Sequence, residues 1–209
     1  MRRYHGMKAA LLSLASLEPG RYAWARLSAL LPPAALRLIA HKQTGGELSW
    51  TQRERLRAAL TAIEMGVEVT DAARALGWSE FEELVQAILE AWGFRTERHV
   101  RLGREELDIV AFRHGICLVL ECKRWRRGLA GLRLSSTLQR LAQKARRLAG
   151  RLPRGVLVYP AMVSLSAPPR PFVRRIPLVP VSRLDDFLGG LEAYLSGAKF
   201  YRGLAGTLA

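Results

Sequence analysis

The chain has 209 residues, of which 49% are hydrophobic and 24% are charged. This composition buries enough apolar surface to offset the entropy of ordering, which excludes general disorder, and the length suits either one substantial core or a core with a small accessory domain. The 33 Lys and Arg residues against 18 Asp and Glu leave a net charge of +15, so a polyanion is the first partner to consider. Because no run of about 18 apolar residues occurs, a membrane-spanning helix is not expected, and nucleic acid is favoured over a membrane.

Residue usage gives weaker indications of source and compartment. Asparagine is absent and Arg outnumbers Lys by 28 to 5, which fits a thermophilic source or a GC-rich genome. On one strand Cys117 and Cys122 would lie about 16 Å apart, beyond disulfide reach. We therefore expect free thiols and a cytoplasmic protein.

The first part of the chain, residues 1–78, predicts a series of short helices separated by proline and glycine breaks. The expected helices span residues 7–17, 22–31, 34–39, 51–63 and 71–76. Residues 67–78 have the character of a helix-turn-helix, but the helix that follows is needed by the next domain. Packing or linking is therefore favoured over base reading for this segment.

From Ser79 the pattern changes to alternating helices and strands. We expect helices at 81–92, 136–148 and 184–195, and strands at 107–112, 116–122, 155–159 and 176–180. This order predicts an α/β fold. The predicted domains are thus a small all-helical domain, 1–78, and an α/β domain, 79–209.

Positive charge gathers within the α/β part. Residues 101–155 hold 14 Lys and Arg against 4 acids, which is +10 of the total. A solvated helix face is one reading, and phosphate contact is the favoured one because arginine forks match phosphate oxygens. The candidate DNA-binding residues are Arg124, Arg126, Arg127, Arg140, Lys144 and Arg147.

The candidate chemistry lies in a predicted β-hairpin of residues 107–122. Both of its strands are apolar on two faces, so Asp108 and Glu121 are unusual there: a buried carboxylate costs free energy unless it is paired or binds a metal. Two-residue alternation places Glu121 and Lys123 on one face, and the hairpin can bring Asp108 beside them. A structural ion pair at a strand end is the alternative.

Two converging carboxylates form a hard-oxygen site suited to Mg²⁺, for which Mn²⁺ can substitute. Lys123 would then hold the attacking water or stabilise charge on a phosphoryl transition state. The four histidines share no ligand spacing with the cysteines, so zinc is not expected.

These residues resemble a known family. Asp108 and Glu121-x-Lys123, preceded by the helix FEELVQAILEAWGF that carries Glu82, are similar to the PD-(D/E)XK nuclease superfamily of restriction-endonuclease-like folds. The nearest groups are archaeal Holliday junction resolvases and Mrr-like endonucleases. The resemblance covers residues 79–123 and is compatible with the order of elements over 136–195. It implies a three-layer core with a mixed central sheet.

The resemblance also implies roles. Asp108 and Glu121 would be metal ligands, with the Cys122 carbonyl as a third ligand, and Lys123 would position water or stabilise charge. Glu82 would assist the water shell of the metal, although Ser79-x-x-Glu82 also matches a helix capping box. Gln139 or Gln143 could match an accessory glutamine of related nucleases.

The sequence departs from the family in two places. Leu107 stands where a proline usually precedes the aspartate, and about 78 residues come before the core helix. We therefore expect an Mg²⁺-dependent DNA endonuclease of repair, recombination or restriction, possible as a homodimer, with the substrate left open. The alternative is a non-catalytic DNA-binding or assembly protein on the same fold.

Overall fold

The computed structural model describes residues 2–124 and 132–205, so Arg126 and Arg127 lie outside the described residues. The chain divides into two compact units, 1–84 and 85–209. The division falls within one helix, α6 (Trp78–Ala91). Among the described residues, no helix is long and apolar enough to cross a membrane.

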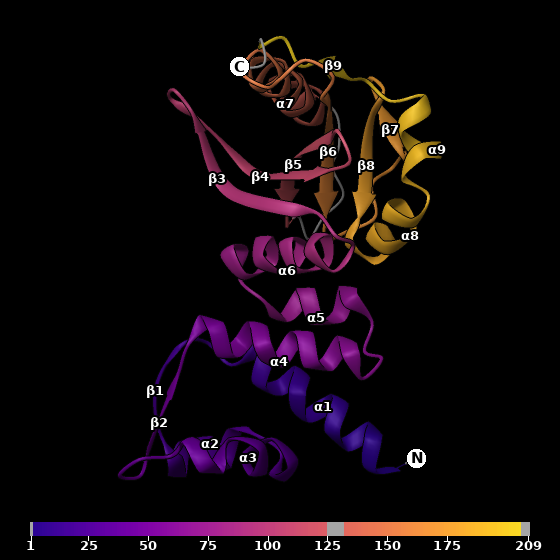
Figure 1. Ribbon diagram of the computed structural model, residues 1–209. Coiled ribbons are helices and arrows are strands. Elements are labelled where there is room, and N and C mark those ends of the chain that lie inside the picture. Colours follow the sequence, from indigo (N-terminus) through magenta and orange to yellow (C-terminus); the bar gives the residue numbers. More distant parts are fainter. Residues whose placement is uncertain (1, 125–131, 206–209) are drawn as a thin grey trace. The chain divides into compact units, whose positions relative to one another are not determined.

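The first unit consists mainly of helices (Figure 1). They are α1 (Arg2–Ser16), α2 (Trp24–Leu30), α3 (Pro33–Ile39), the 3-10 helix η1 (Ala40–Lys42), α4 (Gln52–Glu64), α5 (Val69–Ala75) and the start of α6. The expectation of an all-helical domain was incomplete, because β1 (Gly20–Ala23) pairs antiparallel with β2 (Glu47–Trp50). The sequence predicted a helix from Tyr22, whereas Tyr22 and Ala23 pair with Leu48 and Glu47, because main-chain pairing overrides weak local preferences.

Buried Arg55 links three segments of this unit. Its side chain is 4% exposed and donates to the main-chain oxygens of Ala15 and Ala75. It also pairs with Glu18 at 2.9 Å and with buried Glu80 at 3.4 Å. A buried guanidinium is tolerated only when its donors are satisfied, so this network fixes α1, α4 and α5 together.

The second unit is built on a seven-stranded mixed sheet (Figure 1). Its strand order is β3-β4-β5-β6-β8-β7, and β9 pairs with β6. The strands are β3 (Arg95–Leu102), β4 (Glu105–Arg113), β5 (Ile116–Lys123), β6 (Leu157–Ser164), β7 (Phe172–Val173), β8 (Ile176–Pro180) and β9 (Tyr201–Arg202). The pairs β5–β6 and β6–β8 are parallel, and the remaining pairs are antiparallel.

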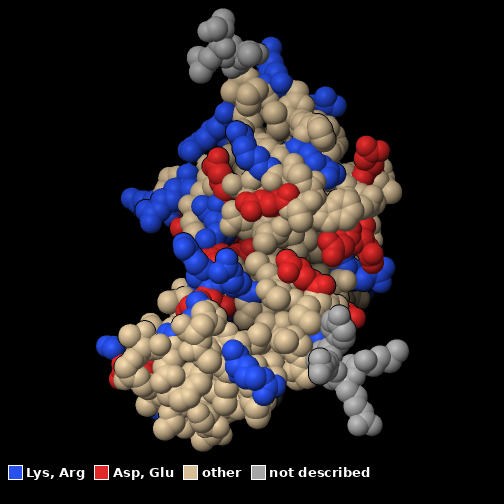
Figure 2. Space-filling model, turned by 60° about the horizontal axis from the view of Figure 1, so that its bottom comes forward, with Lys and Arg blue, Asp and Glu red and all other residues tan. Residues whose placement is uncertain are grey.

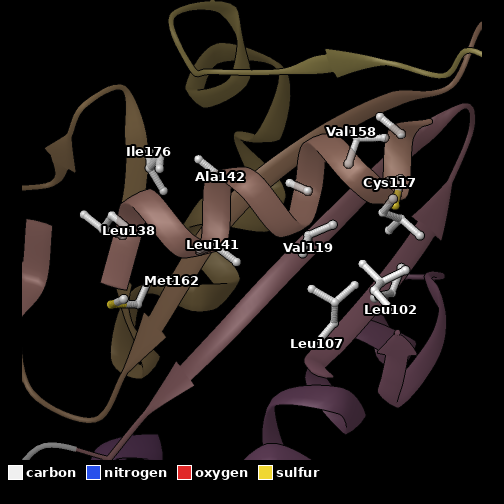
Figure 3. Packing of buried hydrophobic residues seen from close by; sticks show 14 of the residues in the cluster. Leu102, Leu107, Cys117, Val119, Leu138, Leu141, Ala142, Val158, Met162 and Ile176 are labelled. Atoms are coloured by element: carbon white, nitrogen blue, oxygen red, sulfur yellow. The ribbon is translucent and has the colours of Figure 1, made fainter. Parts of the chain in front are cut away.

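Helix α7 (Leu132–Ala149) covers one face of this sheet (Figure 3). Its buried residues recur at helical spacing, and Leu138, Leu141 and Ala142 pack over Val119 of β5 and Met162 of β6. The remaining helical segments are the 3-10 helix η2 (Val181–Arg183), α8 (Leu184–Gly189) and α9 (Leu191–Ser196). The α/β class and the restriction-endonuclease-like core with a mixed sheet are confirmed.

Two predicted elements differ in detail. The expected hairpin forms, with Ile109 opposite Leu120, and His114 and Gly115 make its turn with φ of 48° and 76°. The expected last helix is divided at Gly190 into α8 and α9. Edge strand β3 was not predicted, because its sequence, RTERHVRL, carries mainly charged residues.

Candidate active site

The candidate site lies where β4 and β5 separate. Their pairing runs from Arg113 opposite Ile116 to Ile109 opposite Leu120 and stops there. Beyond that point β4 continues beside β3, while β5 continues beside β6 as far as Lys123. Asp108 and Glu121 are the next residues on the two strands, and beyond the end of the ladder the Asp108 carboxylate accepts from the main chain of β5.

Asp108 is fixed by the main chain of β5. Its Oδ2 accepts a hydrogen bond from the Cys122 amide at 2.8 Å, in the place of a ladder carbonyl. Burial, and then the negative charge of Glu121, raise the pKa of Asp108; the Cys122 amide, Lys123 and Lys144 oppose this shift. The ionised form of Asp108 is therefore disfavoured, first by burial and then by the charge of Glu121.

Glu121 is held between two ammonium groups. Lys123 Nζ lies 2.5 Å from its Oε1, and Lys144 Nζ lies 3.3 Å from its Oε2. The three side chains are only 11–19% exposed. Because Glu121 and Lys123 share a face of β5, as alternation predicts, and α7 covers that face, the site contains two carboxylates and two cations in a largely desolvated space.

Lys144 was assigned to DNA binding by the sequence, and its contact with Glu121 was missed. A signal was present, because Lys144 lies three residues after Leu141 and four before Leu148, so it adjoins the buried stripe of α7. It is also the one lysine in a helix whose other basic residues are arginines. A compact ammonium on a flexible stem reaches a buried carboxylate more readily than a planar guanidinium does.

The donor set fits a hard divalent cation. Among the described residues no group of three or more Asp, Glu, His and Cys side chains is arranged to hold a metal ion. Mg²⁺ commonly binds through one or two carboxylates together with waters and substrate phosphate. Asp108 and Glu121 supply such a pair, and their mutual repulsion favours a cation between them. Ligation by the Cys122 carbonyl stays a prediction.

Glu82 is buried in α6 and is 2% exposed. It belongs to the first unit, and its role in the water shell stays a prediction. The alternative of a capping box lacks its geometry: α6 begins at Trp78 and the Phe81 amide bonds to the Gly77 carbonyl, so Ser79 lies inside the helix instead of at the N-cap.

The two glutamines lie elsewhere on α7. Gln139 and Gln143 line a pocket with Arg146, Arg174 and Lys199. Within the described part of the chain no hydrogen bond joins either glutamine to Asp108 or Glu121. The predicted accessory role therefore has no support from contacts.

The predicted DNA-binding arginines differ in setting. Arg140 is exposed, Arg124 is half-buried, and Arg147 forms an ion pair with Glu105 of β4. Figure 2 shows that on the face in view Lys and Arg gather along one side, while Asp and Glu are more frequent on the other. Within the second unit alone, residues 101–155 hold 14 Lys and Arg against 4 acids, which attracts a polyanion.

Comparison with known proteins places these residues in a family. A family model described as a restriction endonuclease, Mrr_cat, matches residues 73–165, which contain Asp108, Glu121, Lys123 and Lys144. An uncharacterized protein of Archaeoglobus fulgidus is 37% identical over 125 residues, which cover 57% of this chain and 95% of that protein.

Among solved structures, protein VC1899 from Vibrio cholerae aligns with 97% of this chain at 16% identity and a TM-score of 0.42. The chain spans 54% of the length of that protein. A likeness of this size adds nothing to the assignment, which depends on the matched family and on the relative from Archaeoglobus fulgidus. The chain belongs to the restriction-endonuclease-like family of PD-(D/E)XK nucleases.

Proposed function

We propose that the chain is a divalent-metal-dependent DNA endonuclease that hydrolyses phosphodiester bonds in repair, recombination or restriction. The observation that carries this proposal is the meeting of Asp108, Glu121, Lys123 and Lys144 where β4 and β5 separate. Two acids and two cations in a desolvated space match the needs of phosphoryl chemistry, which depends on charge neutralisation and positioned water.

Asp108 and Glu121 would hold the cation, with the Cys122 carbonyl as a third ligand. When bound, Mg²⁺ or Mn²⁺ neutralises charge on the scissile phosphate and lowers the pKa of a bound water. The amide of Cys122 keeps Asp108 Oδ2 oriented toward β5, so this carboxylate needs little rearrangement to bind. Glu82 would complete the set by accepting from water around the cation.

The two lysines would have separate tasks. Lys123 shares a strand with Glu121 and would orient the attacking water or stabilise charge that develops on the phosphate. Lys144 comes from α7 and is a positioning residue, because its ammonium holds the second oxygen of Glu121. This division predicts a larger loss of rate for Lys123 than for Lys144.

The rest of the molecule would supply the substrate contacts. Arg124, Arg126, Arg127, Arg140 and Arg147 would bind DNA phosphates. We assign hydrolysis to residues 79–209 and substrate or partner selection to residues 1–78. A homodimer would allow both strands of a duplex to be cut.

The test is cleavage of labelled duplex, single strand, flap, four-way junction and RNA, with Mg²⁺, Mn²⁺ or EDTA. We expect metal-dependent cutting that falls by about 100-fold or more in Glu121→Gln and in Lys123→Met. Glu106→Gln is the matched control, because it removes an exposed carboxylate from the same strand as Asp108 and should keep the wild-type rate.

A second readout separates metal binding from cleavage. Calorimetric titration with Mn²⁺ should show binding to the wild type that is weakened at least tenfold in Asp108→Asn, while affinity for DNA in EDTA is unchanged. If the wild type binds DNA but cuts nothing with either metal, the chain is a DNA-binding or assembly protein on this fold and our proposal is wrong.

A further inference from the structure

A polar pocket of about 550 Å³ lies in the second unit, between α7, the β7–β8 turn and the segment that leads into β9. Its floor is formed by Leu138, Ala142 and Ile176, which belong to the sheet-facing core. Its rim is formed by polar side chains, namely Gln139, Gln143, Arg146, Arg174, Lys199 and Tyr201. A volume of this size is typical of small-ligand sites.

The charge of the pocket has one sign. Arg146, Arg174 and Lys199 all line it, and of the described residues that do so none is acidic. Throughout the described ranges neither Arg146 nor Arg174 forms an ion pair or a side-chain hydrogen bond. Three cations facing one space repel one another, and an anion between them would remove that repulsion.

The backbone at Arg174 supports the same reading. Val173 pairs with Ile176, so Arg174 and Arg175 are the central residues of a two-residue turn, with φ of 52° and 63°. Turns with two positive φ values favour Asn and Gly, and long side chains are strained there. Strained residues cluster at functional sites, so Arg174 is a candidate for contact with a ligand.

Hydrogen bonds to residues 197 and 199 hold this turn in place. Arg175 Nε donates to the Gly197 carbonyl at 3.0 Å, and the Lys199 amide donates to the Arg175 carbonyl at 2.7 Å. Arg175 therefore has a bracing role, and it ties the turn to the segment that supplies Lys199. Arg174 and Lys199 are brought to the same pocket by this contact.

We propose that this pocket binds a nucleotide, with the phosphates on Arg146, Arg174 and Lys199 and the base against Tyr201 and the two glutamines. Arginine forks and an ammonium match phosphate oxygens, and an aromatic ring stacks on any base. Lys199 Nζ already lies 5.7 Å from the centre of the Tyr201 ring, so the phosphate and base positions adjoin. The nucleotide is either free or the end of a nucleic-acid strand.

The experiment measures equilibrium binding of ATP, pyrophosphate and a 5′-phosphorylated tetranucleotide to the whole chain at low salt in EDTA. EDTA removes any metal-mediated binding at Asp108 and Glu121, so the result is independent of nuclease activity. We expect ATP or the tetranucleotide to bind more tightly than pyrophosphate. Whichever of the two is tighter identifies the source of the nucleotide.

The variants are Arg146→Gln and Arg174→Asn, and the matched control is Arg170→Asn, which changes an exposed arginine that does not line the pocket. Each pocket variant should weaken binding by about tenfold or more, and the control should not. Because Asn suits the turn, Arg174→Asn should keep or raise the melting temperature while it loses the ligand.

Four binding results would each overturn the proposal. The first is that no probe binds, and the second is that neither ATP nor the tetranucleotide binds more tightly than pyrophosphate. The third is that both pocket variants bind with wild-type affinity, and the fourth is that Arg170→Asn loses as much affinity as the pocket variants. A fall in the melting temperature of Arg174→Asn would show that Arg174 is needed for the turn itself, which also contradicts our reading.

Discussion

The ionised carboxylate of Asp108 lowers the stability of the fold. The carboxylate is desolvated and lies near a second acid, and the Cys122 amide with two lysines offsets this only in part, because its pKa stays raised. Without a bound cation the ionised form therefore makes the fold less stable than an uncharged isostere would. Functional sites commonly lower stability in this way.

We predict that Asp108→Asn raises the melting temperature at pH 7 in metal-free buffer. Each 1 kcal/mol regained corresponds to about 2–4 °C for a chain of this size. Because the folded pKa lies above the unfolded one, the cost is absent at low pH and grows as the pH rises through the folded pKa. Thermal unfolding at pH 4 and pH 7 checks this, and a gain that is larger at pH 4 would contradict it.

Burial keeps the Cys117 thiol protonated and therefore unreactive. Desolvation raises the pKa of this thiol to about 12, and the side chain is fully buried. Since the thiolate is the reactive form, we predict negligible alkylation by iodoacetamide at pH 8 in the native state and fast alkylation in guanidinium. Peptide mass spectrometry measures both rates, and native labelling as fast as that of a free thiol would disprove the prediction.

At the scale of elements, α4 begins with a complete capping box. The Thr51 side chain accepts from the Glu54 amide, and the Glu54 carboxylate accepts from the Thr51 amide. Burial tends to raise the pKa of Glu54, but hydrogen bonds from Lys42 and Thr51 outweigh it, so this pKa is lowered. The ionised form of Glu54 thus stabilises the start of the helix.

We predict that Thr51→Ala lowers the free energy of unfolding by about 1 kcal/mol, because the cap is lost. The contribution of Glu54 is fully present above its unfolded pKa and disappears as the pH falls through the lower folded value. Urea denaturation at pH 7 and pH 3.5 tests both points. Thr61→Ala, the same change inside α4, should cost much less, and an equal cost would argue against the cap.

The sequence predicted the elements that have a clear hydrophobic period and turn residues of their own. The β4–β5 hairpin has apolar strands around a His-Gly turn, and α7 has a regular buried stripe, so both were expected. Two-residue periodicity also placed Glu121 beside Lys123. Edge strand β3 and the β1–β2 pair were missed because their pairing depends on main-chain bonds to distant segments, which charged side chains do not reveal.

The contact between Lys144 and Glu121 was missed for a similar reason. The place of Lys144 at Glu121 depends on how α7 lies across β5, and helical periodicity shows only that it adjoins the buried stripe. Likewise, Gln139 and Gln143 were expected near the carboxylates, but their side of α7 faces the β7–β8 turn. Contacts between elements far apart in sequence are set by packing, which residue patterns do not contain.

At the scale of the whole molecule, the net charge of +15 makes binding to DNA sensitive to salt. If the five arginines that we assign to phosphates each contact one, a plot of log K against log salt should have a slope of about −4 to −5 for duplex DNA. Arg140→Ala should make the slope shallower by about 1. Fluorescence anisotropy between 50 and 200 mM salt measures this, and a slope near zero would contradict the assigned interface.

The order of elements along the second unit also determines the order in which the site residues come together during folding. Strands β5 and β6 are parallel, so α7 must cross the sheet before they can pair, and such long-range closure is slow compared with the formation of the β4–β5 hairpin. Asp108 and Glu121 therefore come together early, while Lys144 arrives only when α7 docks. During synthesis, a ribosome-bound chain would carry the two acids and Lys123 before it acquires Lys144, the second cation that holds Glu121, and the proposed nuclease site would be complete only after α7 has docked.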